Sequence, residues 1–515
     1  MALIENKVAI FVENRYQSNM KRLMTPLSIL LVNLAMLAGC NNVDEDYIPG
    51  PIMPPETPEQ NEPPIEHPEE GEMYDSYHGL VMCGYQGWFA CNGDGSQYGP
   101  SWPHYSDKWS FPRIFQPGVG RNGIDLWPDV SEYEITYEAS AFTLPDGTKP
   151  RIFSSYDESS VNLHFKWMKE YGISGVFMQR FASQINNPVA RELSDKVLSS
   201  AMKASDQYGR AICMMYDMVG LGPECTVDQL IEDIRNVSEQ YGFFDRETGH
   251  RYYLYHNGKP LIALVSVDEN ANYTIADAQR IVDTCQEMGF SIMISCPTYW
   301  REGGGDVPFG TAALHELIKD ADILTPWYVG RYDWDGTAGA HGGKFSVFKE
   351  KVAKADKAWL DTYGVEFAPL CFAGYSDRNQ HPNNKVFKRA GGDFFWSQVH
   401  NSIEMGCKMI YVAMFDEIDE GTAIFKCLRQ SEVPSNEYWS EYYVVFENGT
   451  YRRSSTPVTV SGNGNWCKKA SELGITFTGI EDNLQSDHYL WLAGQAGKAI
   501  RKEIPLTAKQ PARQQ

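Results

Sequence analysis

The chain has 515 residues and lacks the cysteine and histidine spacings that mark structural zinc sites. Neither a Cys-x-x-Cys pair nor a His-x-x-x-His pair occurs, so we expect no metal site. Cys83, Cys213, Cys296 and Cys371 fall in apolar runs, where a free cysteine behaves as a small buried hydrophobic residue. Cys83 could instead form a disulfide with Cys91 in an oxidising compartment.

Basic residues are scarce, with 45 Lys and Arg against 67 Asp and Glu and a formal net charge of -22. Nucleic-acid binding needs a basic face, so this composition argues against it. Residues 41–75 contain eleven acids, many prolines and no Lys or Arg. Such a segment cannot bury enough apolar surface to fold, and we expect residues 40–75 to form a disordered acidic tether.

No apolar run has the length of a transmembrane helix, because the stretch from Pro26 to Leu37 is short and contains Asn33. Lys21 and Arg22 precede it, and Leu37-Ala38-Gly39-Cys40 follows, as in a secretory signal over residues 1–39. The last four residues resemble the lipobox of bacterial lipoproteins, which implies a lipid on Cys40. The acids after Cys40 resemble a surface-export signal, so we expect an outer-membrane lipoprotein of a Gram-negative bacterium. Residues 1–19 have no role in this signal, and Met20 is the natural start.

Eight apolar, strand-like runs alternate with amphipathic helical patterns such as 226–241 and 274–288. Thr226 and Gln229 form a possible capping box at the start of the first helix, and Gly289 is expected to end the second. The runs are Leu80–Tyr85, Gly175–Gln179, Ala211–Tyr216, Leu261–Val267, Ser291–Cys296, Ile323–Trp327, Phe367–Phe372 and Met409–Met414. This alternation predicts a parallel sheet closed into a (β/α)8 TIM barrel over residues 76–432. An open doubly wound sheet is the alternative, but no glycine-rich phosphate turn follows the first strand. We expect residues 433–503 to add a short β-rich segment and a closing helix to the same domain, and 504–515 to be a disordered tail.

Active residues of such barrels follow the carboxyl ends of the strands. The candidates there for substrate binding are Gln86, Trp88, Arg180, Asp217, Tyr299, Trp300, Arg301, Trp327, Tyr328, Arg331 and Tyr375. Aromatic rings, arginines and carboxylates together are typical of carbohydrate sites. Each also has a structural explanation: the tryptophans could pack the barrel mouth, and Arg180 and Arg331 could pair with Asp217 or Asp333.

The last strand is followed by Phe415-Asp416-Glu417-Ile418-Asp419-Glu420-Gly421-Thr422. Acids gathered at a strand exit favour paired acid/base chemistry, although they could also begin a helix at its positive end. If the segment turns helically, Glu417 and Glu420 share one side, and Asp416 and Asp419 point elsewhere. We therefore predict Glu417 and Glu420 as the catalytic pair.

The segment Glu417-Ile418-Asp419-Glu420-Gly421-Thr422 resembles the Glu-Trp-His-Glu-Gly-Thr signature of glycoside hydrolases of the family 71/99-like group, which includes endo-α-1,2-mannosidases. A bacterial subgroup often labelled xylosidase/arabinosidase is similar in further motifs. These are 84–89, 125–129, 153–156, 179–181, 215–217, 326–332 and 414–417. The likeness covers residues 78–501.

The resemblance implies a retaining α-glycosidase that needs no cofactor. The residue matching Glu417 acts as base on the sugar 2-hydroxyl, and the one matching Glu420 protonates the leaving oxygen, through an anhydro-sugar intermediate. Ile418 and Asp419 depart from the signature, so the substrate could be a mannan, a glucan or a xylose- or arabinose-containing glycan. The expected partners are a carbohydrate, the membrane and other glycan-utilisation surface proteins. The rival interpretation is a glycan-binding lipoprotein without catalysis; a structural surface protein fits the anchor alone.

Overall fold

The computed structural model of this chain describes residues 72–106, 113–117, 122–267, 272–303, 307–334, 343–382, 384–434, 442–448, 450–473 and 477–513. The predicted signal, Cys40 and nearly all of the acidic tether lie outside these residues. Within the described part of the chain, no helix combines the length and the apolar character needed to cross a bilayer.

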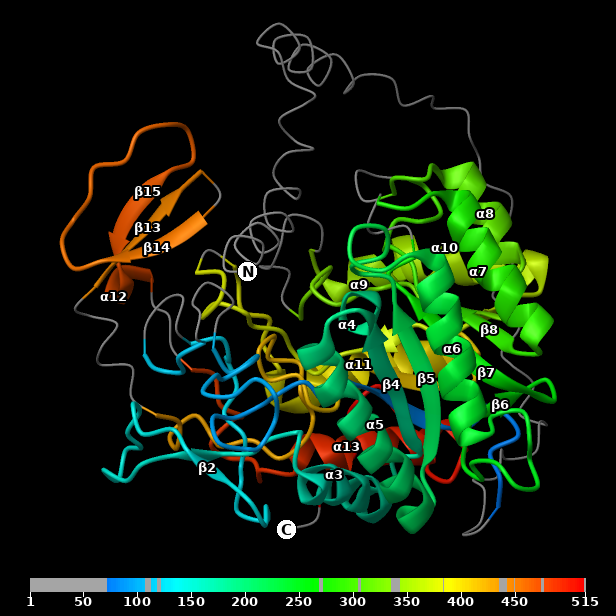
Figure 1. The fold of residues 1–515 in the computed structure, drawn as a ribbon, viewed down its shortest axis with the longest axis horizontal. Coiled ribbons are helices and arrows are strands. Elements are labelled where there is room, and N and C mark those ends of the chain that lie inside the picture. The colour runs from blue at the N-terminus through cyan, green and yellow to red at the C-terminus, as the bar shows by residue number, and fades with distance from the viewer. Residues whose placement is uncertain are drawn as a thin grey trace, which may run out of the picture. The chain divides into compact units, whose positions relative to one another are not determined.

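Parallel strands form a curled, TIM-barrel-like sheet with helices on its outside (Figure 1). In hydrogen-bonded order the strands are β10 (Glu366–Phe367), β9 (Ile323–Leu324), β8 (Ser291–Ile294), β7 (Lys259–Val265), β5 (Ala211–Asp217), β4 (Gly175–Phe181), β1 (Val81–Tyr85), β12 (Ile410–Val412) and β11 (Leu370–Cys371). The short β6 (Tyr255–His256) pairs antiparallel with the start of β7. All eight predicted runs therefore contain strands of this sheet.

The seventh predicted run is interrupted. Its first half, β10, pairs with β9, and its second half, β11, pairs with β12. Ala368 and Pro369 separate the two halves, and Pro369 has no N–H with which to continue the ladder. The two strands at opposite ends of the sheet order are thus neighbours in the chain.

Helices follow most strands, as parallel connections require. They are α3 (Glu158–Tyr171), α4 (Ala182–Ile185), α5 (Pro188–Tyr208), α6 (Val227–Tyr241), α7 (Ile275–Met288), α8 (Thr311–Lys319), α9 (Phe345–Phe348), the π-helical η1 (Lys349–Ala353), α10 (Lys354–Tyr363), the 3-10 turn η2 (Ala390–Gly392), α11 (Asp393–Glu404), α12 (Ala470–Leu473) and α13 (His488–Ile500). The predicted capping box at Thr226 is confirmed, because Thr226 and Gln229 bond each other's backbone N–H. Gly289 ends α7 in the left-handed conformation, also as predicted.

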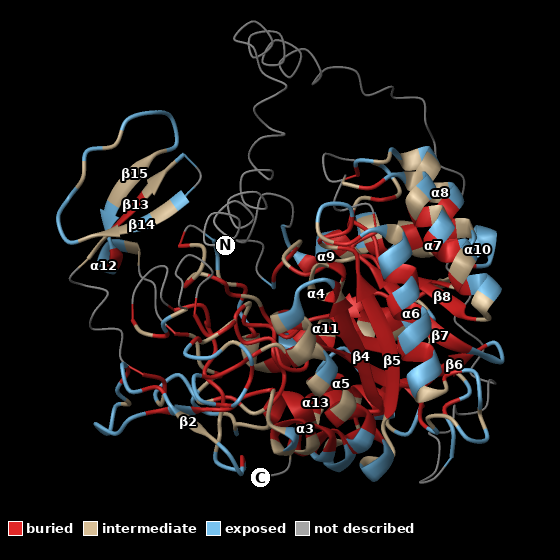
Figure 2. Cartoon of the chain, viewed as in Figure 1, coloured by how far each residue is buried: buried red, intermediate tan, exposed pale blue. Residues whose placement is uncertain are grey.

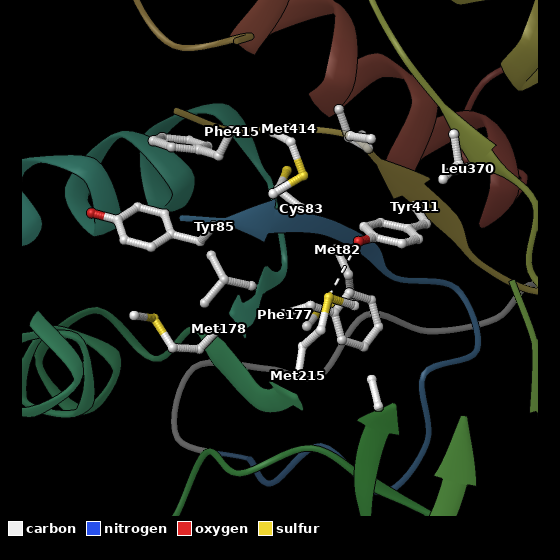
Figure 3. Packing of buried hydrophobic residues seen from close by; sticks show 14 of the residues in the cluster. Met82, Cys83, Tyr85, Phe177, Met178, Met215, Leu370, Tyr411, Met414 and Phe415 are labelled. Atoms are coloured by element: carbon white, nitrogen blue, oxygen red, sulfur yellow. Dashed lines mark hydrogen bonds between the residues drawn. The ribbon is translucent and has the colours of Figure 1, made fainter. Parts of the chain in front are cut away.

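Large apolar side chains fill the interior of the curled sheet. Met82, Phe177, Met215 and Tyr411 point toward one another there, and the Tyr411 hydroxyl donates to Met215 Sδ at 3.5 Å (Figure 3). The strands are buried, whereas the helices expose their outer faces (Figure 2). Truncating a side chain such as Phe177 to Ala costs about 3–5 kcal/mol in a core of this kind. This packing holds the strand ends, and hence the site, in fixed positions.

A second, small sheet belongs to a compact unit separate from the one that contains the barrel-like sheet. Its antiparallel strands are β13 (Tyr443–Glu447), β14 (Thr450–Ser454) and β15 (Trp466–Lys469), in the order β14-β13-β15. The rings of Phe446, Tyr451 and Trp466 pack together on it. The expected β-rich segment is therefore present, but residues 442–469 are separated from the barrel-like unit. A two-stranded sheet, β2 (Tyr137–Glu138) with β3 (Arg151–Ile152), completes the strands.

The structure corrects the expected boundaries of the C-terminal tail and of the acidic tether, and it excludes the alternative of a disulfide between Cys83 and Cys91. The expected tail is held in place over residues 504–513, because Trp396 Nε1 donates to Thr507 O at 2.8 Å and Gln510 Nε2 to Gly391 O at 2.9 Å. Within the expected tether, Tyr74 is buried and bonds Gly209 O at 2.9 Å. Cys83 and Cys91 are both buried free thiols, so the alternative of a disulfide between them does not hold.

Candidate active site

The segment after β12 makes a tight turn instead of a helix. The backbone N–H groups of Thr422 and Ala423 both donate to Glu417 O, at 3.1 and 2.9 Å. Gly421 has a φ of 64°, and a Cβ there would lie 2.9 Å from Ser376 N, so the turn needs glycine. The helical argument for placing Glu417 and Glu420 on one side therefore does not apply, and the side chains must be located individually.

Glu417 lies at the carboxyl end of the sheet and is only 4% exposed. Its Oε2 accepts a hydrogen bond from Gln86 Nε2 at 2.8 Å. Burial raises the pKa of Glu417 well above its usual value, and the negative charges of Asp419 and Glu420 raise it further, while Gln86 opposes the shift. Glu417 thus holds its proton at a higher pH than an ordinary glutamate, as an acid/base group does.

Asp416 connects the exits of β12 and β1. It is fully buried and accepts bonds from Gln86 N at 2.9 Å and Gly87 N at 2.8 Å. Burial raises its pKa to about 7 although these two bonds lower it. Because Asp416 fixes the backbone that follows β1, it holds Gln86 in position to bond Glu417.

Asp419 does not point elsewhere, as the helical spacing suggested, but belongs to the acidic group. Its Oδ2 lies 3.1 Å from His104 Nδ1, and its charge raises the pKa of Glu417. His104 has a φ of 60°, which is uncommon for a residue other than glycine. Trp88 stacks on His104 with ring centroids 3.9 Å apart and lies 5.4 Å from the ring of Phe181.

Sequence reasoning did not identify His104, because it lies in a loop and only the fold brings it to Asp419. The stacking also shows that at least one face of Trp88 is used in packing. The structural interpretation of Trp88 as a packing residue is therefore supported, and its predicted contact with substrate stays a prediction.

Glu420 is half-buried and lies near Tyr375. Burial, followed by the charge of Glu420, raises the pKa of the Tyr375 phenol well above its usual value. Ser376 N donates to Glu420 O at 2.8 Å. Asp125, another residue that sequence reasoning left without a role, accepts from Ser376 Oγ and from Asn379 N and so fixes this loop. The site therefore includes Tyr375.

Asp217 ends β5 and faces the interior of the sheet. It accepts from Gln179 Nε2 at 2.8 Å and from Val219 N at 2.9 Å. Burial raises the pKa of Asp217. Asp217 and Glu417 both raise the pKa of Tyr411, after the larger effect of burial, so both carboxylates face the same interior side chain. Asp217 is thus held by neutral donors near the acidic group, together with Gln179.

Arg180 points to the face of β4 opposite to that of Gln179 and faces the helices. It is 2% exposed, and it donates to Asp233 on α6 at 2.6 and 2.9 Å and to Asp195 on α5 at 2.7 Å. Successive side chains of a strand point to opposite faces, so Gln179 faces the interior and Arg180 does not. This corrects the expected substrate contact of Arg180 to an ion pair between sheet and helices.

Three more candidates face the helical layer. Trp300 is buried against Trp359 and His315, with ring centroids 5.0 and 5.5 Å away. Arg301 Nε donates to Asp356 on α10 at 3.0 Å, and the hydroxyl of the buried Tyr328 donates to the same carboxylate at 2.6 Å. The expected substrate contacts of Trp300, Arg301 and Tyr328 are corrected accordingly, because these side chains anchor α10.

The remaining candidates, Tyr299, Trp327 and Arg331, are half-buried at the exits of β8 and β9. Arg331 Nε donates to Thr298 Oγ1 at 3.1 Å, and this hydroxyl donates to Trp327 O. Trp327 N in turn donates to Cys296 O at 2.9 Å. These contacts place the three residues at the same end of the sheet as the acids.

The acidic group has unused hydrogen-bonding capacity. Gln86 Oε1 and Trp88 Nε1 are buried without a hydrogen-bond partner among the described residues. Buried polar atoms are normally paired, so these two atoms have unused hydrogen-bonding capacity close to Glu417 and His104. The only group of His, Cys, Asp or Glu in the described residues that is close enough to hold a metal ion lies elsewhere, at His78, His256 and Glu366.

Comparison with known proteins identifies the fold. No protein-family model matches the sequence, and no curated protein sequence matches it. Among solved structures, the GH99 endo-alpha-mannosidase from Bacteroides thetaiotaomicron is 13% identical with a TM-score of 0.54, and the alignment covers 83% of this chain and 99% of that chain. The same enzyme in complex with bis-tris-propane gives a TM-score of 0.52. At this identity the likeness establishes a TIM-barrel-like fold, which this chain shares with that enzyme.

Proposed function

We propose that the chain is a glycoside hydrolase in which Glu417 and Glu420 carry out the chemistry. The observation that carries this proposal is the environment of Glu417: a carboxyl at the carboxyl end of a TIM-barrel-like sheet, buried, and raised in pKa beside Asp419 and Glu420. Nearby carboxylates that repel one another destabilise a protein. Such a cluster is typically retained where function requires it. The relation to a GH99 fold is a second, independent support.

The proposed reaction retains the anomeric configuration. Glu417 takes the proton of the sugar 2-hydroxyl as that oxygen attacks C1, while Glu420 protonates the leaving oxygen. Water then opens the anhydro sugar, with Glu420 as base and Glu417 returning the proton. A raised pKa makes Glu417 a stronger base than an ordinary glutamate, which suits the weakly acidic hydroxyl. The bond from Gln86 orients this carboxyl.

The proposed substrate is an α-linked glycan with subsites different from those of the mannosidases. Ile418 is buried, and its carbonyl accepts from Asp125 N and Leu126 N at 2.9 and 3.0 Å, so no aromatic ring from this position can contact sugar. The imidazole of His104 and the ring of Trp88 lie beside the acids instead. Mannans, glucans and xylose- or arabinose-containing polymers are the candidates. The anhydro-sugar route requires a 2-hydroxyl trans to the leaving oxygen, as in α-mannosides. An α-glucan has this hydroxyl cis, and its cleavage with retention would need direct attack by a carboxylate instead.

The test uses the purified full-length chain on a panel of α-mannans, α-glucans, xylans and arabinans. Reducing ends are measured for wild type, Glu420→Gln and the matched control Glu432→Gln, whose carboxylate forms an exposed pair with Arg429. We expect hydrolysis by wild type and the control, a loss of about 1000-fold or more in Glu420→Gln, and unchanged glycan binding. The proton NMR spectrum of the first product should show the anomer of the cleaved bond.

Equal hydrolysis by Glu420→Gln would exclude the assigned chemistry. If neither wild type nor variant hydrolyses any polymer while both bind one, the chain is a glycan-capture protein, and the proposal fails. Product of inverted configuration would leave the hydrolase but remove the anhydro-sugar route.

We further propose that Cys40 carries a lipid that anchors the chain in the outer membrane. The support is the sequence alone, a basic and then apolar segment that ends in Leu-Ala-Gly-Cys. Incorporation of labelled palmitate should be lost in Cys40→Ala and retained in Cys467→Ala. Label in both variants, or in neither wild type nor variant, would contradict the anchor.

A further inference from the structure

A second cluster of ionisable side chains lies at the amino-terminal end of the parallel sheet. His78 precedes β1, His256 ends β6 and pairs with Lys259 at the start of β7, and Glu366 is the first residue of β10. The carboxyl ends of these strands point the other way, toward the candidate active site. The cluster is therefore separate from Glu417 and its neighbours, at the end of a barrel that usually serves stability.

The three residues offer ligand atoms that all lie within 4.8 Å of one another. His78 Nε2 is 2.9 Å from Glu366 Oε2, and His256 Nε2 is 3.6 Å from Glu366 Oε1. Zinc bound at about 2.0–2.2 Å in tetrahedral geometry separates its ligand atoms by roughly 3.3 Å. The observed spacing therefore requires only small side-chain movements to accommodate an ion.

His256 provides the second, independent observation. It is 2% exposed, and its Nε2 is buried without a hydrogen-bond partner in the described residues. Its Nδ1 lies 3.4 Å from Ser76 Oγ, a hydroxyl that can donate to this nitrogen or accept from it, so either ring nitrogen can carry the proton and Nε2 can offer a lone pair to an ion. A buried ring nitrogen without a hydrogen-bond partner is unfavourable, and a cation between Nε2 and the Glu366 carboxylate would satisfy both groups.

The surroundings fix the geometry of both imidazoles. The ring of Tyr77 lies 4.9 Å from that of His78 and 4.8 Å from that of His256. The Tyr77 hydroxyl donates to Glu366, as the partner of a ligating carboxylate does. Two imidazoles and one carboxylate held in this way form a ligand set common in zinc sites.

We propose that His78, His256 and Glu366 bind one divalent transition-metal ion of the zinc type, which ties the starts of β1, β7 and β10 together. Binding uses the Nε2 lone pairs of both histidines, so the proton through which His78 bonds Glu366 moves to Nδ1 or to solvent. A water or the Tyr77 hydroxyl completes the coordination. The sequence gives no sign of this site, because its ligands lie 178 and 110 residues apart along the chain.

The competing account is a network of hydrogen bonds that needs no ion. In that account the pair between His78 and Glu366 and the bond from Tyr77 satisfy the carboxylate fully. It leaves His256 Nε2 with the distant contact to Glu366 Oε1 at 3.6 Å and no hydrogen bond, whereas an ion would supply a ligand bond. The two accounts differ in stoichiometric metal binding, and that difference is measurable.

The experiment takes the full-length chain, purified with a tag that contains no histidine and dialysed against a chelator. Zn²⁺ is titrated calorimetrically, and Co²⁺ is added separately to record its visible spectrum. The variants are His256→Gln and Glu366→Gln. The matched control is His400→Gln, which removes an imidazole that pairs with Glu404 on the surface of α11.

We expect one equivalent of Zn²⁺ per wild-type or control chain, a Tm that rises with the logarithm of free Zn²⁺, and intense visible Co²⁺ bands of four-coordination. Both variants should bind at least about 100-fold more weakly. Binding that the variants leave unchanged would overturn the proposal. If the variants fail to fold, the wild-type spectrum decides, because the absence of the Co²⁺ bands would also overturn it.

Discussion

Glu417, at the carboxyl end of the sheet, lies beside two further acids, whereas Glu366, at the amino end, lies between two imidazoles and a phenol. Burial raises the pKa of both carboxyls. At Glu417 the charges of Asp419 and Glu420 raise it further. At Glu366 the hydrogen bonds from His78 and Tyr77 outweigh burial and bring the pKa to about 2.

The difference between the two ends separates structure from function. An acid whose charge is balanced by a basic partner stabilises the fold. Asp233 is an example, because it pairs with Arg180 between the sheet and its helices. Uncompensated, mutually repelling acids cost stability, and a fold retains them where a proton must be moved. Of the two ends, only the carboxyl end therefore has the electrostatics of acid/base catalysis.

The largest effect is expected from Glu417→Gln, which removes the carboxyl but keeps its shape. Glycan hydrolysis should fall about 1000-fold or more, equivalent to about 4 kcal/mol of lost transition-state stabilisation. The fall is measured from initial rates on the polymer that wild type hydrolyses, normalised to the amount of folded protein. Glu432→Gln serves as the control. Activity within tenfold of wild type would remove Glu417 from the chemistry.

Arg180→Met should destabilise the fold without abolishing activity. It leaves Asp233 buried, with the half-exposed Arg191 at 3.4 Å as its remaining charged partner and the Tyr216 hydroxyl at 3.1 Å, and should cost about 3–5 kcal/mol of unfolding free energy. Urea unfolding measures this, with Lys203→Met, which breaks an exposed pair with Glu158, as the control near zero. A stable Arg180→Met chain that has lost glycan binding would restore Arg180 to the substrate site.

Asp416→Asn should change the pH dependence of stability. The folded pKa of Asp416 is raised to about 7, so the folded state binds the extra proton and wild-type stability declines as pH rises from about 4 toward 7. The variant should lack this contribution, a slope difference of up to about 1.4 kcal/mol per pH unit. The measurement is the unfolding free energy of wild type and variant between pH 4.5 and 7.5. If the two curves of free energy against pH run parallel, the raised pKa of Asp416 is contradicted.

Asp419→Asn should move the acid limb of the activity profile. Removing the charge beside Glu417 lowers the pKa of that carboxyl, so the base ionises at lower pH. We expect the acid limb of kcat/KM to shift to lower pH. A shift in the opposite direction would show that another group sets this limb.

The smallest effect is expected from Glu366→Gln, measured in chelator. The folded pKa of Glu366 is lowered to about 2, so its stabilising contribution is present above its unfolded pKa and is lost as pH falls toward 2. The variant should be less stable than wild type at pH 6, with a difference that narrows at pH 3. The sign is opposite to that of Asp416, and equal differences at both pH values would contradict it.

Several features of the fold follow from local sequence patterns. The strand-like runs and the capping box at Thr226 depend on neighbours in the chain, and all are present. The break in the seventh strand was readable too, since Pro369 cannot donate to a ladder. The acids after β12 lie at the carboxyl end of the sheet because strand direction determines which end they occupy.

The rest depends on contacts between distant segments. Side chains alternate between the two faces of β4, so Gln179 faces the interior of the sheet and Arg180 faces the helices. Position at the carboxyl end of a strand does not by itself distinguish the two faces. His104 reaches Asp419 through a loop with a left-handed residue, which no periodicity reveals. His78, His256 and Glu366 meet only when the sheet curls, so their spacing along the chain gives no motif.

The most direct measurement is a carbon-13 NMR titration of glutamate side-chain carboxyls in wild type and Glu417→Gln, each labelled at the glutamate δ carbon. We expect a carboxyl in wild type that titrates well above the usual range of glutamate, about 4.3, and is absent from the variant. If every glutamate of the wild-type chain titrates in the usual range or below it, Glu417 is an ordinary carboxylate, and the catalytic assignment of this end of the sheet is contradicted.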